Sequence, residues 1–214
     1  MTVVAKFTFN PFQENTYILH DATKECIIID PGCYNAKEKQ ELSDFIDQNE
    51  LQPVRLINTH CHLDHIFGNQ FVANTYKLPL EIHRGELPVL QAVPQVCQAY
   101  GLPLPDPSPE PERFIEDGEQ IEFGESQLET LFTPGHSPAS ISFFCRKSKF
   151  VIAGDVLFYG SIGRTDLPGG NFNTLIDSIK TKFYPLGDDV IVYPGHGPET
   201  NIGFEKANNP FLNR

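Results

Sequence analysis

The residues whose types and spacing suggest chemistry begin with one short segment, Thr59–His65, which reads Thr-His-Cys-His-Leu-Asp-His. It follows a short apolar run that predicts a buried strand and precedes a run that predicts a helix. Side chains at i and i+2 of an extended chain point the same way, so His60 and His62 can face one point. Asp64 and His65 lie beyond the bend and can face a neighbouring point. The segment therefore predicts a site for two metal ions, with a solvated polar turn as the alternative.

Three later stretches share a pattern in which a predicted strand ends in a His or an Asp among turn residues. They are Phe132–His136, Ile152–Asp155 and Val192–His196. In two of them Pro-Gly precedes the His, and this pair makes a tight turn because Gly tolerates unusual backbone angles and close approach. A single His after Pro-Gly is more typical of a loop than of a metal site. The three stretches together, in this order, indicate further metal ligands.

The elements that must position these residues follow from hydrophobic periodicity and turn residues. Strands are predicted at Val3–Phe9, Asn15–Leu19, Cys26–Ile29, Val54–Ile57, Leu80–His83, Ile121–Phe123, Leu128–Phe132, Ile141–Phe144, Phe150–Ala153 and Val190–Tyr193. Helices are predicted at Ala36–Gln48, Phe67–Tyr76, Glu86–Tyr100, Asn173–Thr181 and Ile202–Ala207. Strands followed by a helix, repeated in the second half, predict an α+β fold. We expect a four-layer αββα sandwich of two mixed sheets with helices on the outer faces, formed by a single domain over residues 1–214.

One segment departs from this periodicity. Between Gly101 and Glu112 the chain carries five Pro in twelve residues, which makes it too rigid and too poor in N–H donors for regular structure. It is predicted to be a loop that crosses the surface, and a loop that overhangs the site is the alternative.

The composition is that of a soluble globular protein, with 40% hydrophobic and 21% charged residues. A net charge of −12 argues against the clustered Lys and Arg that nucleic-acid binding requires. Five Cys without a Cys-x-x-Cys pair indicate reduced thiols. No apolar run approaches the ~20 residues of a membrane span, and the N-terminus lacks the features of a signal peptide. We therefore predict a cytoplasmic monomer or small homo-oligomer without nucleic-acid or membrane partners.

Taken together, these motifs resemble those of the metallo-β-lactamase superfamily, and in particular its short, single-domain, glyoxalase II-like thioester hydrolases. The resemblance covers nearly the whole chain. It implies the metallo-β-lactamase fold without the separate C-terminal helical domain that completes the glutathione site of larger relatives. The family motif H-x-H-x-D-H and the later family ligands match His60, His62, Asp64, His65, His136, Asp155 and His196. The implied first ion is bound by His60, His62 and His136, the second by Asp64, His65 and His196, and both by Asp155.

Imidazole and carboxylate ligands suit two divalent ions, zinc first, with iron or manganese as alternatives. The resemblance implies a hydrolase in which a hydroxide bridging the two ions, held by Asp155 and oriented by Asp64, attacks a carbonyl carbon. The implied substrate is a small thioester of the hydroxyacylglutathione type, such as S-lactoylglutathione. Arg164 lies where these enzymes place a basic residue that contacts the glutathione carboxylate. The alternative for Arg164 is a pairing with Asp166 inside its own loop.

Other activities remain open at this point. A related group of persulfide dioxygenases binds one iron through two His and a carboxylate and uses oxygen. Lactone, β-lactam or other ester hydrolysis is a further alternative. A non-catalytic binding module is disfavoured because all seven ligands are present, and a nuclease is disfavoured by the negative charge. Cys61 is predicted to be a packed thiol that points away from the ligands. His83 is predicted to have a structural or solvent-facing role, with a place at the edge of the site as the alternative, and His20 is predicted to be a turn residue.

Overall fold

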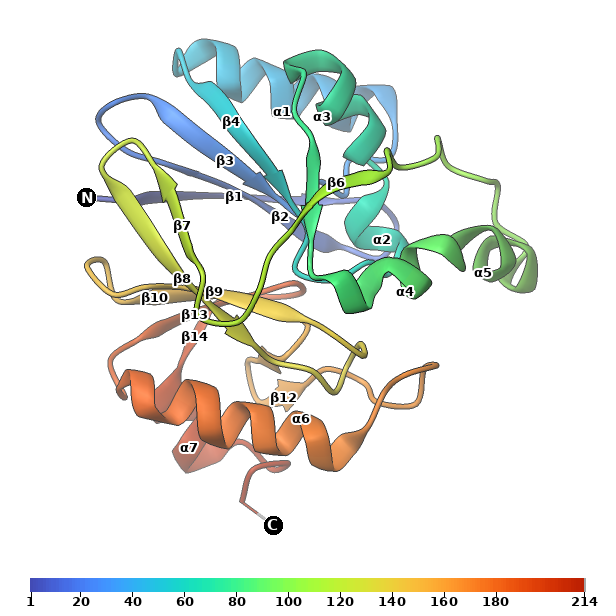
Figure 1. Cartoon of the computed structure of the whole chain (residues 1–214). Helices are drawn as coiled ribbons and strands as arrows, with labels where there is room; N and C mark the ends of the chain where they lie inside the picture. The colour runs from blue at the N-terminus through green and yellow to red at the C-terminus, as the bar shows by residue number, and fades with distance from the viewer. Residues whose placement is uncertain (214) are drawn as a thin grey trace. The chain divides into compact units, whose positions relative to one another are not determined.

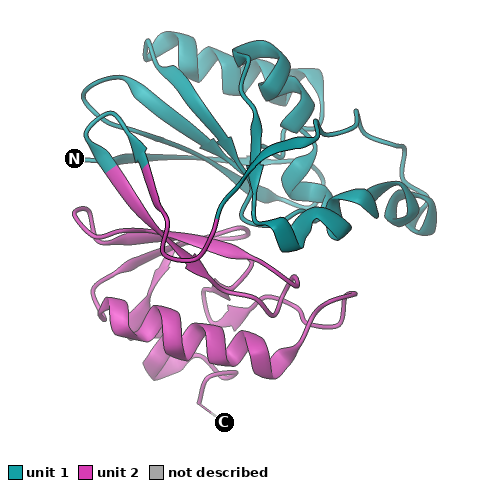
Figure 2. Ribbon diagram, in the orientation of Figure 1, with its two compact units in different colours: residues 1–115, 122–126 teal, residues 116–121, 127–214 magenta. Residues whose placement is uncertain are grey.

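The computed structural model describes residues 1–213, and these form two compact units (Figure 2). Unit 1 comprises residues 1–115 and 122–126, and unit 2 comprises residues 116–121 and the described residues from 127 onward. The prediction of one domain stays a prediction. Each unit has a six-stranded sheet and its own cluster of buried apolar side chains.

In unit 1, six strands form a mixed sheet (Figure 1). In sheet order the strands are β1 (Val3–Phe9), β2 (Glu14–His20), β3 (Glu25–Ile29), β4 (Gln52–Ile57), β5 (Leu80–Ile82) and β6 (Pro111–Phe114). The pairs β1–β2 and β2–β3 are antiparallel, whereas β3, β4, β5 and β6 run parallel to one another. Parallel strands have their carboxyl ends at the same edge of a sheet. The turns that follow β3, β4 and β5 therefore gather at one edge.

The helices of unit 1 are α1 (Ala36–Gln48), α2 (Leu63–Ile66), α3 (Asn69–Tyr76), the 3₁₀ turn η1 (Arg84–Glu86), α4 (Leu87–Gln91) and α5 (Val93–Tyr100). α1 begins at a capping box, because the side chain of Asn35 accepts the N–H of Glu38 and the Glu38 carboxylate accepts the N–H of Asn35. Its residues Leu42 and Ile46 are fully buried in one apolar cluster with residues of β2, β3 and β4. This core fixes the positions of the strand ends that carry the turns.

The helix predicted at Phe67–Tyr76 is observed as α3, and a short helix that was not predicted, α2, precedes it and begins inside the His-rich segment, with a break at Phe67 and Gly68 between the two. At the break the N–H of Gly68 donates to the carbonyl of Pro31 at 2.7 Å. A Cβ at this position would lie 2.4 Å from the Sγ of Cys33, so only Gly allows the approach. The break thus locks α2 against the turn that follows β3.

In unit 2, six strands form a second mixed sheet. In sheet order they are β14 (Thr200–Asn201), β13 (Ile191–Pro194), β10 (Phe150–Gly154), β9 (Ile141–Cys145), β8 (Ser126–Phe132) and β7 (Gln120–Phe123), with the β7–β8 turn assigned to unit 1. β10 and β13 are a parallel pair, whereas β9–β10, β13–β14 and β8–β9 are antiparallel pairs. The other elements are the hairpin β11 (Leu157–Phe158) and β12 (Ser161–Ile162), α6 (Phe172–Ser178), the π-helical turn η2 (Ile179–Phe183), the 3₁₀ turn η3 (Tyr184–Leu186) and α7 (Ile202–Asn208). Two mixed sheets with helices confirm the predicted α+β class.

Several short elements were not predicted. β6 lies at the end of the Pro-rich segment, and Pro111 is tolerated there because β6 is an edge strand of its sheet. β11, β12 and β14 have two residues each and carry no periodic pattern. The predicted helix Glu86–Tyr100 is divided into α4 and α5, each with a Pro in its first turn. Among residues 1–213, no helix has the length and apolar character needed to cross a bilayer.

Candidate metal centre

The His-rich turn of unit 1 brings its four predicted ligands together. The ring centroids of His60 and His62 lie 4.8 Å apart with the rings nearly perpendicular, and those of His60 and His65 lie 4.1 Å apart. His62 is the last extended residue before α2, so Asp64 and His65 lie on the first turn of that helix. The Nε2 of His65 is 3.8 Å from a carboxylate oxygen of Asp64. His60 and His65 are fully buried, whereas His62 and Asp64 are half-buried.

Asp30, at the carboxyl end of β3, orients two of these imidazoles. One of its carboxylate oxygens lies 3.1 Å from the Nδ1 of His65, and the same oxygen accepts the Thr59 hydroxyl at 2.6 Å. Because that hydroxyl donates to Asp30, its oxygen accepts the Nδ1–H of His60, 3.0 Å away. Both rings therefore carry their proton on Nδ1 and present Nε2 as the lone-pair nitrogen. This is the tautomer that metal-binding His adopts when a carboxylate holds the other ring nitrogen.

Three further polar side chains, those of Asn10, Asn58 and Glu14, support the His-rich turn. The amide of Asn10 donates to the carbonyl of Asp64 at 2.9 Å, and the amide of Asn58 donates to the carbonyl of His65 at 3.0 Å. Glu14 is fully buried, with an oxygen 3.8 Å from the Nδ1 of His65. Burial raises the pKa of the Glu14 carboxyl well above its ordinary value. The His-rich turn is thus fixed by side chains from the turn between β1 and β2, from the first residue of β2 and from the residue that follows β4.

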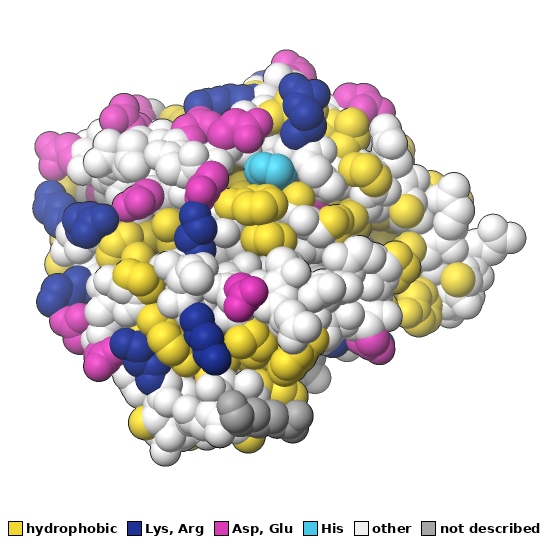
Figure 3. All heavy atoms as spheres, turned by 60° about the horizontal axis from the view of Figure 1, so that its bottom comes forward, with side chains coloured by type: hydrophobic (Ala, Val, Ile, Leu, Met, Phe, Trp, Pro, Cys, Tyr) yellow, Lys and Arg dark blue, Asp and Glu magenta, His cyan; other side chains and the backbone are white. Residues whose placement is uncertain are grey.

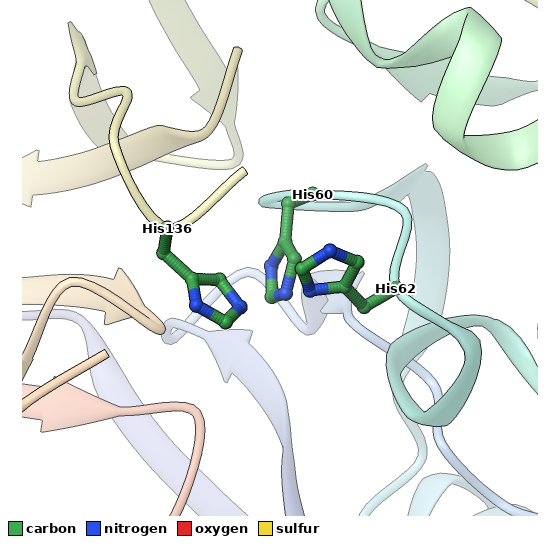
Figure 4. A group of neighbouring side chains, drawn as sticks. All are labelled: His60, His62 and His136. Atoms are coloured by element: carbon green, nitrogen blue, oxygen red, sulfur yellow. The ribbon is translucent and has the colours of Figure 1, made fainter. Parts of the chain in front are cut away.

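In unit 2, three separate strand ends supply the other predicted ligands. His136 follows β8, Asp155 follows β10 and His196 follows β13. One carboxylate oxygen of Asp155 lies 3.4 Å from the Nε2 of His136 and 3.5 Å from the Nε2 of His196. Asp155 therefore stands between the two imidazoles. Figure 4 draws His136 on the loop after β8, and His60 and His62 on the turn after β4.

Main-chain contacts position the ligands of unit 2. Gly135 has a φ of +131°, and a Cβ there would lie 2.3 Å from the backbone nitrogen of Leu175, so the expected need for Gly before His136 is confirmed. The Nδ1 of His136 lies 2.7 Å from the carbonyl of Arg164 and donates to it. This leaves the Nε2 of His136 as the lone-pair nitrogen, facing Asp155.

The second Pro-Gly turn works differently from the prediction. Gly195 is not among the Gly residues with positive φ within the described chain. Its N–H instead donates to the carbonyl of Gly154 at 2.8 Å, which continues the parallel pairing of β10 and β13. The residues after these two strands, Asp155 and His196, are therefore held side by side by the sheet itself.

Arg164 is exposed, and its guanidinium forms two hydrogen bonds of 2.7 Å with the carboxylate of Asp166. This is the loop pairing that the sequence offered as an alternative. Hydrogen bonding by Arg164 lowers the pKa of Asp166 to about 2, so the pair is charged on both sides at neutral pH. The main chain of Arg164 orients His136, while its side chain remains at the surface.

Other side chains singled out in the sequence have structural roles. Cys61 is fully buried, and burial raises the pKa of its thiol well above the ordinary value, so it remains protonated. The Nδ1 of His83 accepts the N–H of Gly85 and caps η1. Asp30 and Glu14 were missed by the sequence interpretation. The sequence did carry a signal for Asp30, because this residue ends a strand and is followed by Pro-Gly. His136 and His196 also lie at strand ends, where they follow Pro-Gly.

Comparisons with known proteins identify the family. The family model described as the metallo-beta-lactamase superfamily matches residues 9–196. The hydroxyacylglutathione hydrolase GloC of Haemophilus influenzae is 38% identical over 203 residues, which cover 94% of this chain and 94% of that protein. Two solved structures, the B3 metallo-beta-lactamase BLEG-1 and TTHA1623 in a di-iron-bound form, are each 34% identical to the chain. Their TM-scores are 0.90 and 0.87, and they cover 99% and 98% of this chain and 100% of their own chains.

These similarities confirm the fold that the resemblance implied. The family match includes every predicted ligand, from His60 to His196. The His and Asp groups described above are the donor types that divalent metals take in proteins, and their hydrogen-bond partners present the correct ring nitrogens. The chain therefore belongs to the metallo-β-lactamase superfamily, has its fold, and is a metal-dependent hydrolase.

Proposed function

We propose that the protein is a binuclear metal-dependent thioester hydrolase that acts on hydroxyacylglutathione-type substrates. His60, His62 and His136, which Figure 4 draws, would hold the first ion. Asp64, His65 and His196 would hold the second, and Asp155 would be a ligand of both. Zinc is the expected metal, and the di-iron form of TTHA1623 makes iron the first alternative.

The observation that carries this proposal is the set of hydrogen-bond partners at the Nδ1 atoms of the imidazoles. The Nδ1 atoms of His60, His65 and His136 are each engaged by an oxygen of the protein, at 3.0, 3.1 and 2.7 Å. Nε2 is thus the nitrogen whose lone pair is available to a metal in each of the three rings, and this holds in both units. An oxygen that holds Nδ1 and leaves Nε2 available is typical of metal-binding His, whereas His residues that only fill space do not require it.

The chain's own residues have separate tasks in the reaction. Bound divalent ions supply water activation at neutral pH and polarisation of the substrate carbonyl. The Asp64 carboxylate, half-buried at the start of α2, would accept a hydrogen bond from the attacking water and orient it. The Asn10 amide, which holds the carbonyl of Asp64, keeps this residue in place. Asp155 fixes the separation of His136 and His196 through its shared oxygen.

We propose that the substrate is a small molecule whose carboxylate pairs with Arg164. A substrate carboxylate would exchange with that of Asp166, since both groups accept the same two N–H bonds from the guanidinium. The 38% identity with a hydroxyacylglutathione hydrolase supports this substrate class. On the face shown in Figure 3, Lys and Arg side chains are interspersed with Asp and Glu side chains, which supports a small-molecule substrate over nucleic acid. The five Cys are all buried thiols, which supports a reducing, cytoplasmic compartment.

The test is an assay of S-lactoylglutathione hydrolysis by the purified chain, in which the released thiol is measured. The proposal predicts turnover that is lost after removal of metal by a chelator and restored by zinc or iron. Full activity of a metal-free preparation would overturn it. Metal binding without thioester turnover would overturn the substrate class and leave the metal site intact.

A second candidate is β-lactam hydrolysis, favoured by the 34% identity and TM-score of 0.90 with BLEG-1. The same groups would then act on the strained amide of a four-membered ring. A chromogenic cephalosporin, assayed beside S-lactoylglutathione on one preparation, separates the two candidates by the ratio of their kcat/KM values. The primary proposal predicts that the thioester is favoured.

A further inference from the structure

The His60–Cys61–His62 stretch must hold two imidazoles apart while its central residue faces inward. The Cys61 side chain is fully buried in the apolar cluster of unit 1. The two ring centroids on either side of it lie 4.8 Å apart, with the rings at 86° to each other. A rotation of the Cys61 peptide would turn both rings at once. The geometry of the pair therefore depends on what holds the backbone of Cys61.

The topology of unit 1 supplies supports from both neighbours of β4. β4 lies between the parallel strands β3 and β5, so the turns after these strands flank the turn after β4. On the β3 side, the Asp30 carboxylate accepts the N–H of Thr59 at 2.7 Å and engages His65. Asp30 therefore holds the two ends of the segment. The middle of the His-rich segment, at Cys61, is contacted from the β5 side.

That contact comes from Glu86, the last residue of η1 in the turn after β5. Its Oε2 accepts the backbone N–H of Cys61 at 3.0 Å, and only 1% of Glu86 is exposed. η1 is itself fixed by His83, whose ring caps it through the N–H of Gly85. A buried carboxylate is costly to place unless it is well hydrogen-bonded, so its presence here calls for a local reason. The neighbouring ligand stretch provides that reason.

We propose that Glu86 is a positioning residue of the metal centre, which sets the orientation of His60 and His62 by holding the N–H of Cys61. This inference rests on the proposed metal site and names a residue beyond its ligands. The inference assigns Glu86 a role through the backbone of Cys61 and not as a ligand. Loss of a residue that orients ligands from outside typically weakens metal binding by about 10–100-fold.

Three substitutions separate position from charge. Glu86→Gln keeps an acceptor oxygen at the same reach and removes the charge. Glu86→Asp keeps the charge but shortens the side chain by one methylene, which withdraws the oxygen from the N–H. Glu86→Ala removes both. The inference predicts affinity within about 3-fold of wild type for Gln, and affinity about 10–100-fold weaker for Asp and Ala.

The readouts are zinc affinity, from competition with a chromogenic chelator, and the visible absorption spectrum of the cobalt-substituted protein. The spectrum reports ligand geometry and needs no substrate. The matched control is Asp21→Ala, because Asp21 is another buried carboxylate of unit 1 that accepts a backbone N–H, that of Glu125 at 2.7 Å, in a turn that carries no ligand. The control is expected to lower the free energy of unfolding and to leave the cobalt spectrum unchanged.

A folded Glu86→Ala protein with wild-type zinc affinity and spectrum would overturn the inference. So would a Gln variant as weak as Ala beside a wild-type-like Asp variant, since charge and not position would then be the cause. If the Ala variant does not fold, the contrast between Gln and Asp decides the question. Because zinc binding is measured without substrate, failure of thioester hydrolysis in the wild type would leave this result interpretable.

Discussion

The two units present their predicted metal ligands in contrasting ways. Unit 1 presents four predicted ligands from one continuous turn, and the turn is fixed by the side chains of Asp30, Asn10 and Asn58. Unit 2 presents three ligands from three strand ends, fixed by main-chain contacts such as those of Gly195 and of the Arg164 carbonyl. The unit 1 turn is built by specific side chains and can be damaged one side chain at a time. The unit 2 group is held by main-chain contacts, so apart from its predicted ligands it is sensitive mainly where a backbone approach requires Gly, as at Gly135.

The largest effect is expected at Asp155, because both imidazoles of unit 2 lie within 3.5 Å of its carboxylate and both proposed ions depend on it. Asp155→Ala is predicted to lower kcat for thioester hydrolysis by about 10³-fold or more, the scale of losing a main electrostatic contribution. Steady-state kinetics together with metal content per chain measure this. A variant that keeps kcat within about 10-fold of wild type would show that Asp155 does not take part in the proposed metal site.

A smaller effect is expected at Asp30, which supports ligands without being one. Asp30→Ala removes the acceptor of both the His65 ring and the Thr59 hydroxyl, so the two rings lose their fixed tautomer. Zinc affinity is predicted to fall by about 10–100-fold. Competition with a chelator measures it, and Asp44→Ala on the exposed face of α1 is the control. Equal affinities for the two variants would contradict the side-chain support inferred for unit 1.

Arg164 is expected to have a modest effect, since its guanidinium is exposed and already paired. Arg164→Ala is predicted to raise KM for a carboxylate-bearing thioester by about 5-fold, the scale of an exposed ion pair, with kcat nearly unchanged. The main-chain carbonyl that holds His136 remains, so metal affinity should stay at the wild-type level. A comparable rise in KM for a thioester without a carboxylate would argue against a role in recognising that group.

The smallest effect on the site is expected at Asp21, a buried carboxylate remote from the ligands of unit 1. Burial alone would raise its pKa, but hydrogen bonds from Thr23, Ser126 and Glu125 outweigh burial and lower it to about 2 from an ordinary 3.8. Its contribution to stability is therefore present above about pH 4 and is lost as the pH falls towards 2. It amounts to at most about 2 kcal/mol.

Asp21→Asn is accordingly predicted to lower the free energy of unfolding at neutral pH and to weaken its dependence on pH in the acid range. Urea denaturation at neutral pH and at about pH 3 measures both changes. Zinc affinity should not change. A shift in zinc affinity would show that the turns of unit 1 are not independent.

The contrast between the units also explains what could be predicted from the sequence. The ligands of unit 1 are four residues of one segment, so their spacing alone indicated a metal site. Those of unit 2 are separated along the chain, and each was convincing only in combination with the others. The strands and the long helix α1 were predicted because their periodicity is strong. The break at Gly68 depends on a contact with Pro31, distant in sequence, and could not be predicted.

The supporting residues were the least predictable part. Asp30 and Glu86 reach the His-rich turn only because β3 and β5 flank β4 in the sheet. A sequence pattern gives the existence of strands but not their order, so the neighbours of the turn were unknown. The same holds for Glu14, which meets His65 through the pairing of β2 with β3. The ligands were predicted from residue type and spacing, whereas the residues that support them could be identified only from the strand order.

The central claim of the proposed function is that the seven predicted ligands bind a pair of metal ions. Elemental analysis of the purified chain, saturated with zinc and freed of excess, tests this most directly. The account predicts two ions per chain for the wild type, and a loss of bound metal in Asp155→Ala. A wild-type protein that binds one ion per chain or none, under conditions where it is folded, would contradict it.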